Sequence, residues 1–143
     1  PLMNESILLL IRQVYASAEQ YGRRQLHAWG LSPAQAFVLD SLLSREGTCC
    51  ASELRETLGI SKSTLSELLA SLQDKGFLEM PLDPSDDRKK RLMPTPKARH
   101  QAKALHAAIQ TQLQVLLQGV SPQQVDCART VRCRMQENLT QAE

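Results

Sequence analysis

The feature that most limits the possible folds is a pair of short helical patterns joined by a glycine. Residues 52–58 have the spacing of one short helix, which Gly59 ends. Ser61 is a favourable cap for a second helix, and Gly76 ends that helix as the residue after its last turn. One face of the second helix carries four leucines, Leu65, Leu68, Leu69 and Leu72. Two helices joined by a turn of about three or four residues that contains glycine are the pattern of a helix-turn-helix.

The residues that follow this motif predict a β-hairpin. Residues 77–80 alternate in character and indicate a short strand, and residues 91–93 are its expected partner. Between them, Asp83-Pro84 favours a turn, and four consecutive bases follow at residues 88–91. A hairpin in this position is a wing attached to the helix-turn-helix.

Long amphipathic helices are expected on both sides of this middle unit. A hydroxyl residue before a proline marks the start of three of them, at Ser32-Pro33, Thr95-Pro96 and Ser121-Pro122. Their apolar positions run to about Gly47, to about Gly119 and to the end of the chain, and a further helix reaches about His27. The expected fold class is mainly α (α+β), with residues 33–95 forming the winged helix-turn-helix.

The long helices also predict association with a second copy of the chain. Residues 1–30 and 96–143 carry broad apolar stripes, which the compact middle unit is too small to cover. A homodimer is the simplest cover, so these two segments are predicted to be dimerisation helices.

The charge distribution indicates a polyanionic partner. The chain of 143 residues has a formal net charge of only +2, but residues 88–103 contain seven Lys and Arg residues and no acid. A local basic patch of this kind attracts nucleic acid.

Other classes of protein lack support in the sequence. No apolar run approaches the ~20 residues that span a bilayer, so a cytoplasmic protein is expected. No nucleophile–base pair, phosphate loop or metal-ligand spacing is present, so we expect neither an enzyme nor a metal or cofactor. Cys49 and Cys50 are expected to be buried thiols in a small first strand, with redox sensing left open. Cys127 and Cys133 lie about 240° apart on a helix and cannot bridge each other within it.

Over about residues 6–139 the sequence resembles the MarR family of bacterial transcription regulators. The resemblance rests on LSPAQAFVLDSL, on ASELRETLGISKSTLSELLASLQDKGFLEM and on DPSDDRKKRL, in this order. It implies a homodimer that binds double-stranded DNA at a pseudo-palindromic operator. It also implies release from DNA by a small phenolic or anionic molecule or by cysteine oxidation. Asp86 and Arg88 match the Asp-x-Arg that family members carry in the wing.

Two groups of residues are the expected DNA-binding site. On the second helix of the motif, the leucines face inward, which leaves the start of the helix to meet phosphates and base edges. Glu67 either accepts from cytosine N4 or repels phosphates, and a merely solvated face remains the alternative. In the wing, Asp86 is expected to orient Arg88 into a minor groove while the later bases contact phosphates; the alternative is a charged loop that protects a sheet edge. The candidate residues are Ser61, Lys62, Ser63, Thr64, Ser66, Glu67, Asp86, Arg88, Lys89, Lys90 and Arg91.

A ligand site is implied only by the resemblance, at the junction of the terminal helices and the winged unit. Tyr21, His27, Trp29 and Phe37 fall near that junction and are the candidates, with plain core packing as the alternative. The resulting expectation is a dimeric DNA-binding regulator, acting as a repressor because blocking a promoter requires only binding. The competing hypothesis is a winged-helix protein-interaction module without sequence-specific DNA binding. Steep weakening by salt is expected for the first and not for the second.

Overall fold

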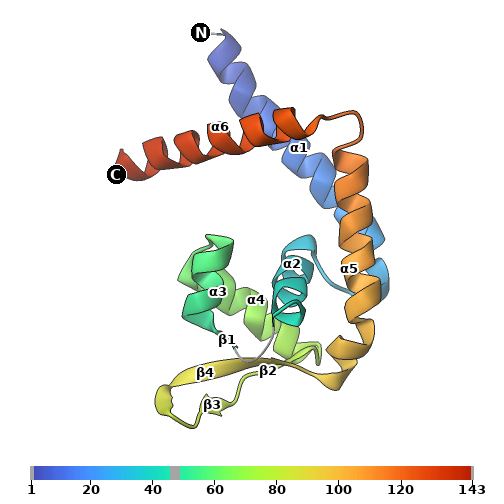
Figure 1. Cartoon of the computed structure of the whole chain (residues 1–143), viewed down its shortest axis with the longest axis vertical. Helices are drawn as coiled ribbons and strands as arrows, with labels where there is room; N and C mark the ends of the chain where they lie inside the picture. Colours follow the sequence, from blue (N-terminus) through green and yellow to red (C-terminus); the bar gives the residue numbers. More distant parts are fainter. Residues whose placement is uncertain (1, 46–48, 143) are drawn as a thin grey trace. The chain divides into compact units, whose positions relative to one another are not determined.

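The computed structural model describes residues 2–45 and 49–142, and the side chains of all of these except residues 2–5 and 86–88. Contacts divide the chain into two compact units, residues 1–112 and 113–143. The elements in chain order are α1 (Leu2–Gln25), a 3-10 turn η1 (His27–Trp29), α2 (Pro33–Leu43), β1 (Cys49–Cys50), α3 (Ala51–Leu58), α4 (Lys62–Asp74), β2 (Leu78–Glu79), β3 (Leu82–Asp83), β4 (Asp86–Pro94), α5 (Pro96–Leu116) and α6 (Pro122–Gln141) (Figure 1). The predicted fold class, mainly α with a small antiparallel sheet, is confirmed.

The three predicted hydroxyl–proline helix starts are confirmed. The Ser32 hydroxyl accepts from the Gln35 amide at 3.2 Å, and the Gln35 side chain accepts from the Ser32 amide at 3.1 Å. Ser121 and Gln124 form the same reciprocal pair at the start of α6. Thr95 accepts from the Ala98 amide at 3.3 Å and donates to the Gly76 carbonyl at 2.7 Å, which joins the start of α5 to the end of α4. These caps satisfy amides that the first turn of a helix leaves free.

The helix-turn-helix is also confirmed, with both of its glycines in the expected roles. Gly59 ends α3 at a φ of +65°, a left-handed conformation that side chains other than glycine rarely adopt. Ser61 then caps α4 by accepting from the Thr64 amide at 3.2 Å. Gly76 follows the last residues of α4 at a φ of +81°, and the Phe77 amide donates back to the Leu72 carbonyl at 2.9 Å.

The wing differs from the predicted hairpin in where its strands begin. β1, β2 and β3 each pair antiparallel with the long strand β4, in registers that include Cys49 opposite Leu92 and Leu82 opposite Lys90. Because β4 begins at Asp86, the four bases at residues 88–91 lie on a strand and not in a loop between strands. The reason is β3, a short pairing partner that the sequence pattern did not reveal.

The turn between β3 and β4 is closed by Asp83. Its carboxylate accepts from the backbone amide of Ser85 at 2.9 Å and from the Ser85 hydroxyl at 2.7 Å. These two hydrogen bonds lower the pKa of Asp83, and the positive charges of Arg91 and Lys89 lower it further. Turn chemistry therefore accounts for the first of the three aspartates in this segment.

A leucine core joins the helices of the winged unit to α5. Its members come from α2, α3, α4, β2 and α5, and Phe77 is the one buried aromatic residue of the cluster in the described part of the chain. The leucines that are fully or almost fully buried, at 2% exposure or less, are Leu26, Leu39, Leu54, Leu65, Leu72, Leu78, Leu92 and Leu105.

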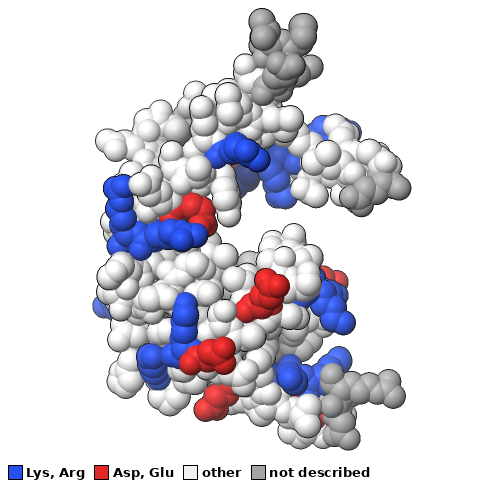
Figure 2. Space-filling view, turned by 180° about the vertical axis from the view of Figure 1, so that it is seen from behind, with Lys and Arg blue, Asp and Glu red and all other residues white. Residues whose placement is uncertain are grey.

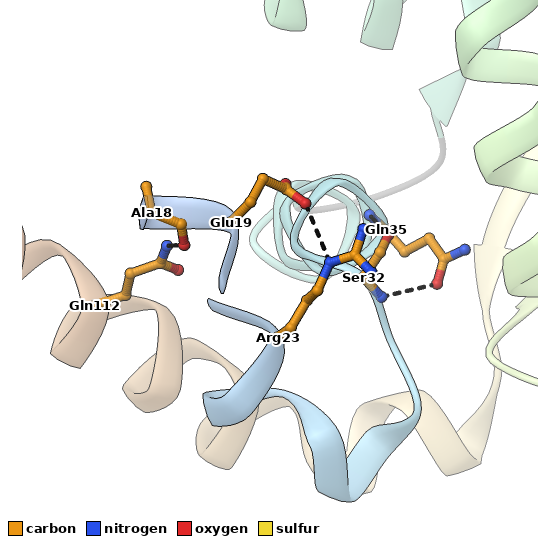
Figure 3. A network of polar contacts seen from close by, with 6 residues as sticks. All are labelled: Ala18, Glu19, Arg23, Ser32, Gln35 and Gln112. Carbon is orange, nitrogen blue, oxygen red and sulfur yellow. Dashed lines mark hydrogen bonds and ion pairs between the residues drawn. The ribbon is translucent and has the colours of Figure 1, made fainter. Parts of the chain in front are cut away.

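Close contacts tie α1 to α2 and to α5 (Figure 3). The Gln112 side chain donates from Nε2 to the Ala18 carbonyl at 3.0 Å. Gly22 lies so close to its neighbours that a Cβ atom there would be 2.9 Å from Pro33 Cγ and 3.0 Å from Gln112 Nε2. A side chain at residue 22 therefore cannot be added unless the Pro33 ring and the end of the Gln112 side chain shift. On the outside of α1, Arg23 pairs with Glu19 at 3.4 Å.

Among the described helices, none is long and apolar enough to cross a membrane.

Candidate nucleic-acid interface

The first two turns of α4 present a polar face to solvent. Leu65, Leu69 and Leu72 are buried and Leu68 is half-buried, so the predicted inward stripe is confirmed. Opposite them, the exposed side chains are Lys62, Ser63, Thr64, Ser66 and Glu67. This face holds donors, acceptors and one charge of each sign, which is the chemistry that reads base edges and phosphates.

Two of the candidate hydroxyls on α4 have structural roles. The Ser61 hydroxyl caps the helix and donates to Thr64 Oγ1 at 2.8 Å. It also lies 3.3 Å from Ser63 Oγ. Ser61 and Thr64 therefore hold the start of α4 in place, whereas no hydrogen bond of the Lys62, Ser66 or Glu67 side chains is found in the described part of the chain.

A hollow lies between α3 and α4 beside this face. Its volume is about 230 Å³, and it is lined by Ala51, Ser52, Arg55, Lys62, Leu65 and Ser66. Sequence reasoning missed Ser52 and Arg55. The available signal was their spacing of three residues on the first helix of the motif, which places both on one side of that helix.

The bases of the wing differ in their surroundings. Lys89 and Lys90 are exposed on β4. Arg91 is half-buried opposite Cys50 of β1, with a buried Nε that has no partner and an Nη2 3.8 Å from Met93 Sδ. Lys89 and Lys90 are thus free to meet a phosphate, while Arg91 packs partly against the sheet. The predicted pairing of Asp86 with Arg88 lies outside the described side chains.

The charge on the surface is local and not general. Figure 2 shows Lys and Arg side chains in several separate groups on one face, with Asp and Glu between them. The structure is therefore consistent with contact to a polyanion at limited places, in keeping with the small net charge.

The four candidate ligand-binding residues are not brought together in one hollow. Trp29 lines a space of about 260 Å³ with Ala28, Phe77, Lys97 and Gln101. Its indole donates to Gln101 Oε1 at 3.0 Å, and the Lys97 ammonium lies 4.5 Å from the centre of the Phe77 ring. Tyr21 is half-buried, and His27 and Phe37 are exposed; none of these three lines that space.

The cysteines are free thiols with different exposures. Cys49 is buried in β1, and burial raises the pKa of its thiol. The expectation that Cys50 is also buried is wrong: it is half-buried, and its Sγ lies 3.0 Å from Ser52 Oγ. Cys127 and Cys133 are exposed on α6. Among the side chains that the structure describes, no three His, Cys, Asp or Glu residues gather as metal ligands would.

Comparison with known proteins supports the predicted resemblance. Residues 29–89 match the model of the MarR family. The chain is similar in structure to a mutant MarR from E. coli complexed with operator DNA, with 23% identity, a TM-score of 0.75 and coverage of 94% of this chain and 98% of that one. It is also similar to the S. aureus MepR–DNA complex, with 18% identity, a TM-score of 0.79 and coverage of 91% and 96%. A third similar structure is Bordetella bronchiseptica BpsR, whose DNA binding is regulated by 6-hydroxynicotinic acid, with 21% identity, a TM-score of 0.74 and coverage of 89% and 90%.

At these identities the structural matches establish the fold. That fold is a winged helix.

Proposed function

We propose that this chain, a member of the MarR family, is the protomer of a dimeric regulator that binds a pseudo-palindromic DNA operator and represses transcription. The observation that carries the proposal is the exposed polar face at the start of α4, next to a β-hairpin that carries lysine and arginine residues. A helix with small hydroxyl residues, one lysine and one glutamate fits the major groove, and the hairpin fits the adjacent backbone and minor groove. The DNA-bound structures of MepR and MarR have the same fold.

Roles for the candidate residues follow from their positions. Lys62, Ser63, Ser66 and Glu67 face outward and are proposed to meet bases or phosphates, while Ser61 and Thr64 hold the start of the helix. In the wing, Lys89 and Lys90 are proposed to contact phosphates, with Arg88, oriented by Asp86, entering the minor groove. Arg91, which is half-buried, is proposed to contribute less than the two lysines.

Exposed apolar side chains support the homodimer. In α1 they include Leu8 at 72% exposure and Tyr15 at 67%, and in α6 they include Leu139 at 67%. Large apolar surfaces in water are unfavourable, and a symmetric partner is the commonest cover. Residues 1–30 and 96–143 are accordingly proposed as the dimerisation helices, and residues 33–95 as the DNA-binding unit of a cytoplasmic protein.

Release from DNA by a small molecule is part of the proposal. BpsR, a protein of similar fold, is regulated by 6-hydroxynicotinic acid. In this chain, the hollow beside Trp29 offers two aromatic rings and the ammonium of Lys97, a combination that suits a small planar anion. Because Trp29 is the chain's one tryptophan, its fluorescence should report such a ligand directly.

The test is selection of bound sequences from random DNA by the full chain. A two-fold symmetric consensus whose affinity falls steeply with salt is expected. If no sequence is enriched and the weak binding depends little on salt, the competing protein-interaction module is the better description.

A further inference from the structure

The hollow between α3 and α4 has the chemistry of an anion site. Arg55 and Lys62 bring two cations to it, and Ser52 and Ser66 bring two hydroxyls, over a floor that includes Leu65. No carboxylate is among its lining residues. Guanidinium and ammonium groups are donors only, so the polar groups of this space favour an acceptor with negative charge.

Neither cation has an ion-pair partner among the described side chains that would explain its position. In the described part of the chain, the ion pairs involve other residues, so Arg55 and Lys62 are in none of them. The acid in the first turn of α3, Glu53, lies close enough to Cys49 that its charge raises the pKa of that thiol, and it does not line the hollow. An anion in this space would be within reach of two cationic side chains from its lining.

We propose that this hollow holds one backbone phosphate of the bound DNA, between Arg55 of the first helix and Lys62 of the second. The proposal rests on the DNA-binding function proposed above and adds residues that the outward face of α4 does not include. In a helix-turn-helix, the first helix crosses the DNA backbone while the second enters the groove. A base edge in the groove meets the outward face of α4, whereas the backbone passes the seam between the two helices.

Such a contact would position the protein on DNA without reading its sequence. Phosphate contacts set the register and orientation of a DNA-binding domain, and base contacts then give specificity. Holding the phosphate between two helices fixes α4 along the groove, so that Ser63, Ser66 and Glu67 meet the same base pairs each time. Arg55 is thus a positioning residue, and it acts on specificity only through α4.

The test compares Arg55→Gln, Arg55→Lys and the wild type on two DNAs, the selected operator and a random duplex of equal length. Each binding constant is measured from about 0.05 to 0.3 M salt. Each phosphate contact contributes about 0.9 to the slope of log affinity against log salt. If the variant and the wild type bind equally at 1 M salt, the loss of one contact therefore lowers the affinity of the variant at 0.1 M salt about eightfold. Arg55→Gln should therefore lose close to one unit of slope per protomer, equally on both DNAs. Arg55→Lys, which keeps the charge, should retain the slope.

Matched controls separate this contact from a general change of charge or folding. Arg24→Gln removes one exposed guanidinium from α1 and should leave both slopes unchanged. Thermal melts show whether the Arg55 variants fold as the wild type does, and if Arg55→Gln does not fold, Lys62→Gln replaces it with the same expected loss of slope. Inorganic phosphate at constant ionic strength should compete weakly with DNA for the wild type and not for Arg55→Gln.

Two results overturn the proposal. One is an unchanged slope in a folded Arg55→Gln, and the other is a loss confined to the operator, because Arg55 would then read a base. A wild type that binds no DNA preferentially contradicts the proposed function instead. If the slopes are unchanged while inorganic phosphate still competes, the first of the two results applies and the hollow is a free-anion site.

Discussion

The winged unit and the first helix, α1, differ in how far their apolar side chains are buried. Leu54 and Leu72 of the winged unit are fully buried, whereas Leu8 and Tyr15 of α1 are 72% and 67% exposed. One region completes its core within a single chain, and the other presents apolar surface that the proposed dimer would cover. The difference indicates that the stability of the winged unit and the association of the chain depend on separate sets of residues.

The largest expected effect is on the core of the winged unit. Leu72→Ala removes a fully buried side chain and should lower the free energy of unfolding by about 2–5 kcal/mol. Leu82→Ala, the same substitution at a residue that is 58% exposed in β3, should change it by less than about 0.5 kcal/mol. Urea denaturation measures the free energy of unfolding of both variants. Equal losses in the two variants would show that Leu72 does not belong to the core.

Charge on α1 should affect association and leave the winged unit folded. Leu8→Glu combined with Ile11→Glu places unpaired carboxylates on the proposed dimer surface, which should weaken the dimer by roughly 3 kcal/mol or more, over a hundredfold. Light scattering at micromolar concentration should show a dimer for the wild type and a monomer for the double variant. Gln73→Glu, an exposed residue of α4, is the control for added charge. A monomeric wild type would contradict the proposed dimer.

The wing extends the comparison to side chains that serve binding and not folding. Arg88→Ala should weaken operator binding by about 1–3 kcal/mol per half-site, and Lys89→Ala should weaken binding to every sequence nearly equally. Neither should shift the thermal melt appreciably. Asp86→Ala should weaken specific binding only while Arg88 is present, because the acid by itself repels DNA. Equal effects of Arg88→Ala and Lys89→Ala on operator and random DNA would leave the wing as a diffuse positive patch.

The smallest expected effect concerns Cys49. Burial raises the pKa of its thiol in the folded chain above the ordinary value of 9.0, so the folded state keeps a proton that the unfolded state loses. The stability that the Cys49 thiol contributes is fully present below pH 9.0 and is lost as the pH rises through the pKa of the thiol in the folded state. Cys49→Ala should therefore flatten the fall in stability above pH 9, and Cys50→Ala should not. Urea denaturation at pH 8 and pH 10 measures how far the free energy of unfolding falls in each variant. An equal fall in both variants would contradict this role of Cys49.

Local chemistry made the helix boundaries predictable from the sequence. Ser32, Ser121 and Gly59 determine where a helix starts or ends through bonds or backbone angles within a few residues. The leucine stripe of α4 was equally legible, because helical spacing alone decides which residues share a face.

Features that depend on distant partners could not be predicted in the same way. The start of β4 depends on its pairing with β3, and the half-burial of Arg91 depends on β1 lying opposite. The hollow with Arg55 exists because α3 packs against α4, which the spacing within either helix does not show. Tyr21, His27 and Phe37 are close in sequence to Trp29, but none of them lines the hollow beside it.

The close approach at Gly22 has a geometric consequence for the proposed dimer. Since Gly22 has no side chain, the backbone of α1 can lie close to the side chains of Pro33 and Gln112, and this close packing helps to set the angle at which α1 leaves the winged unit. In a dimer built on α1, that angle determines how far apart the two copies of α4 are held. Recognition helices must lie about 34 Å apart to enter successive turns of the same groove. The absence of a side chain at residue 22 thus helps to set the separation of operator half-sites that the dimer prefers. A larger residue at position 22 should alter that separation.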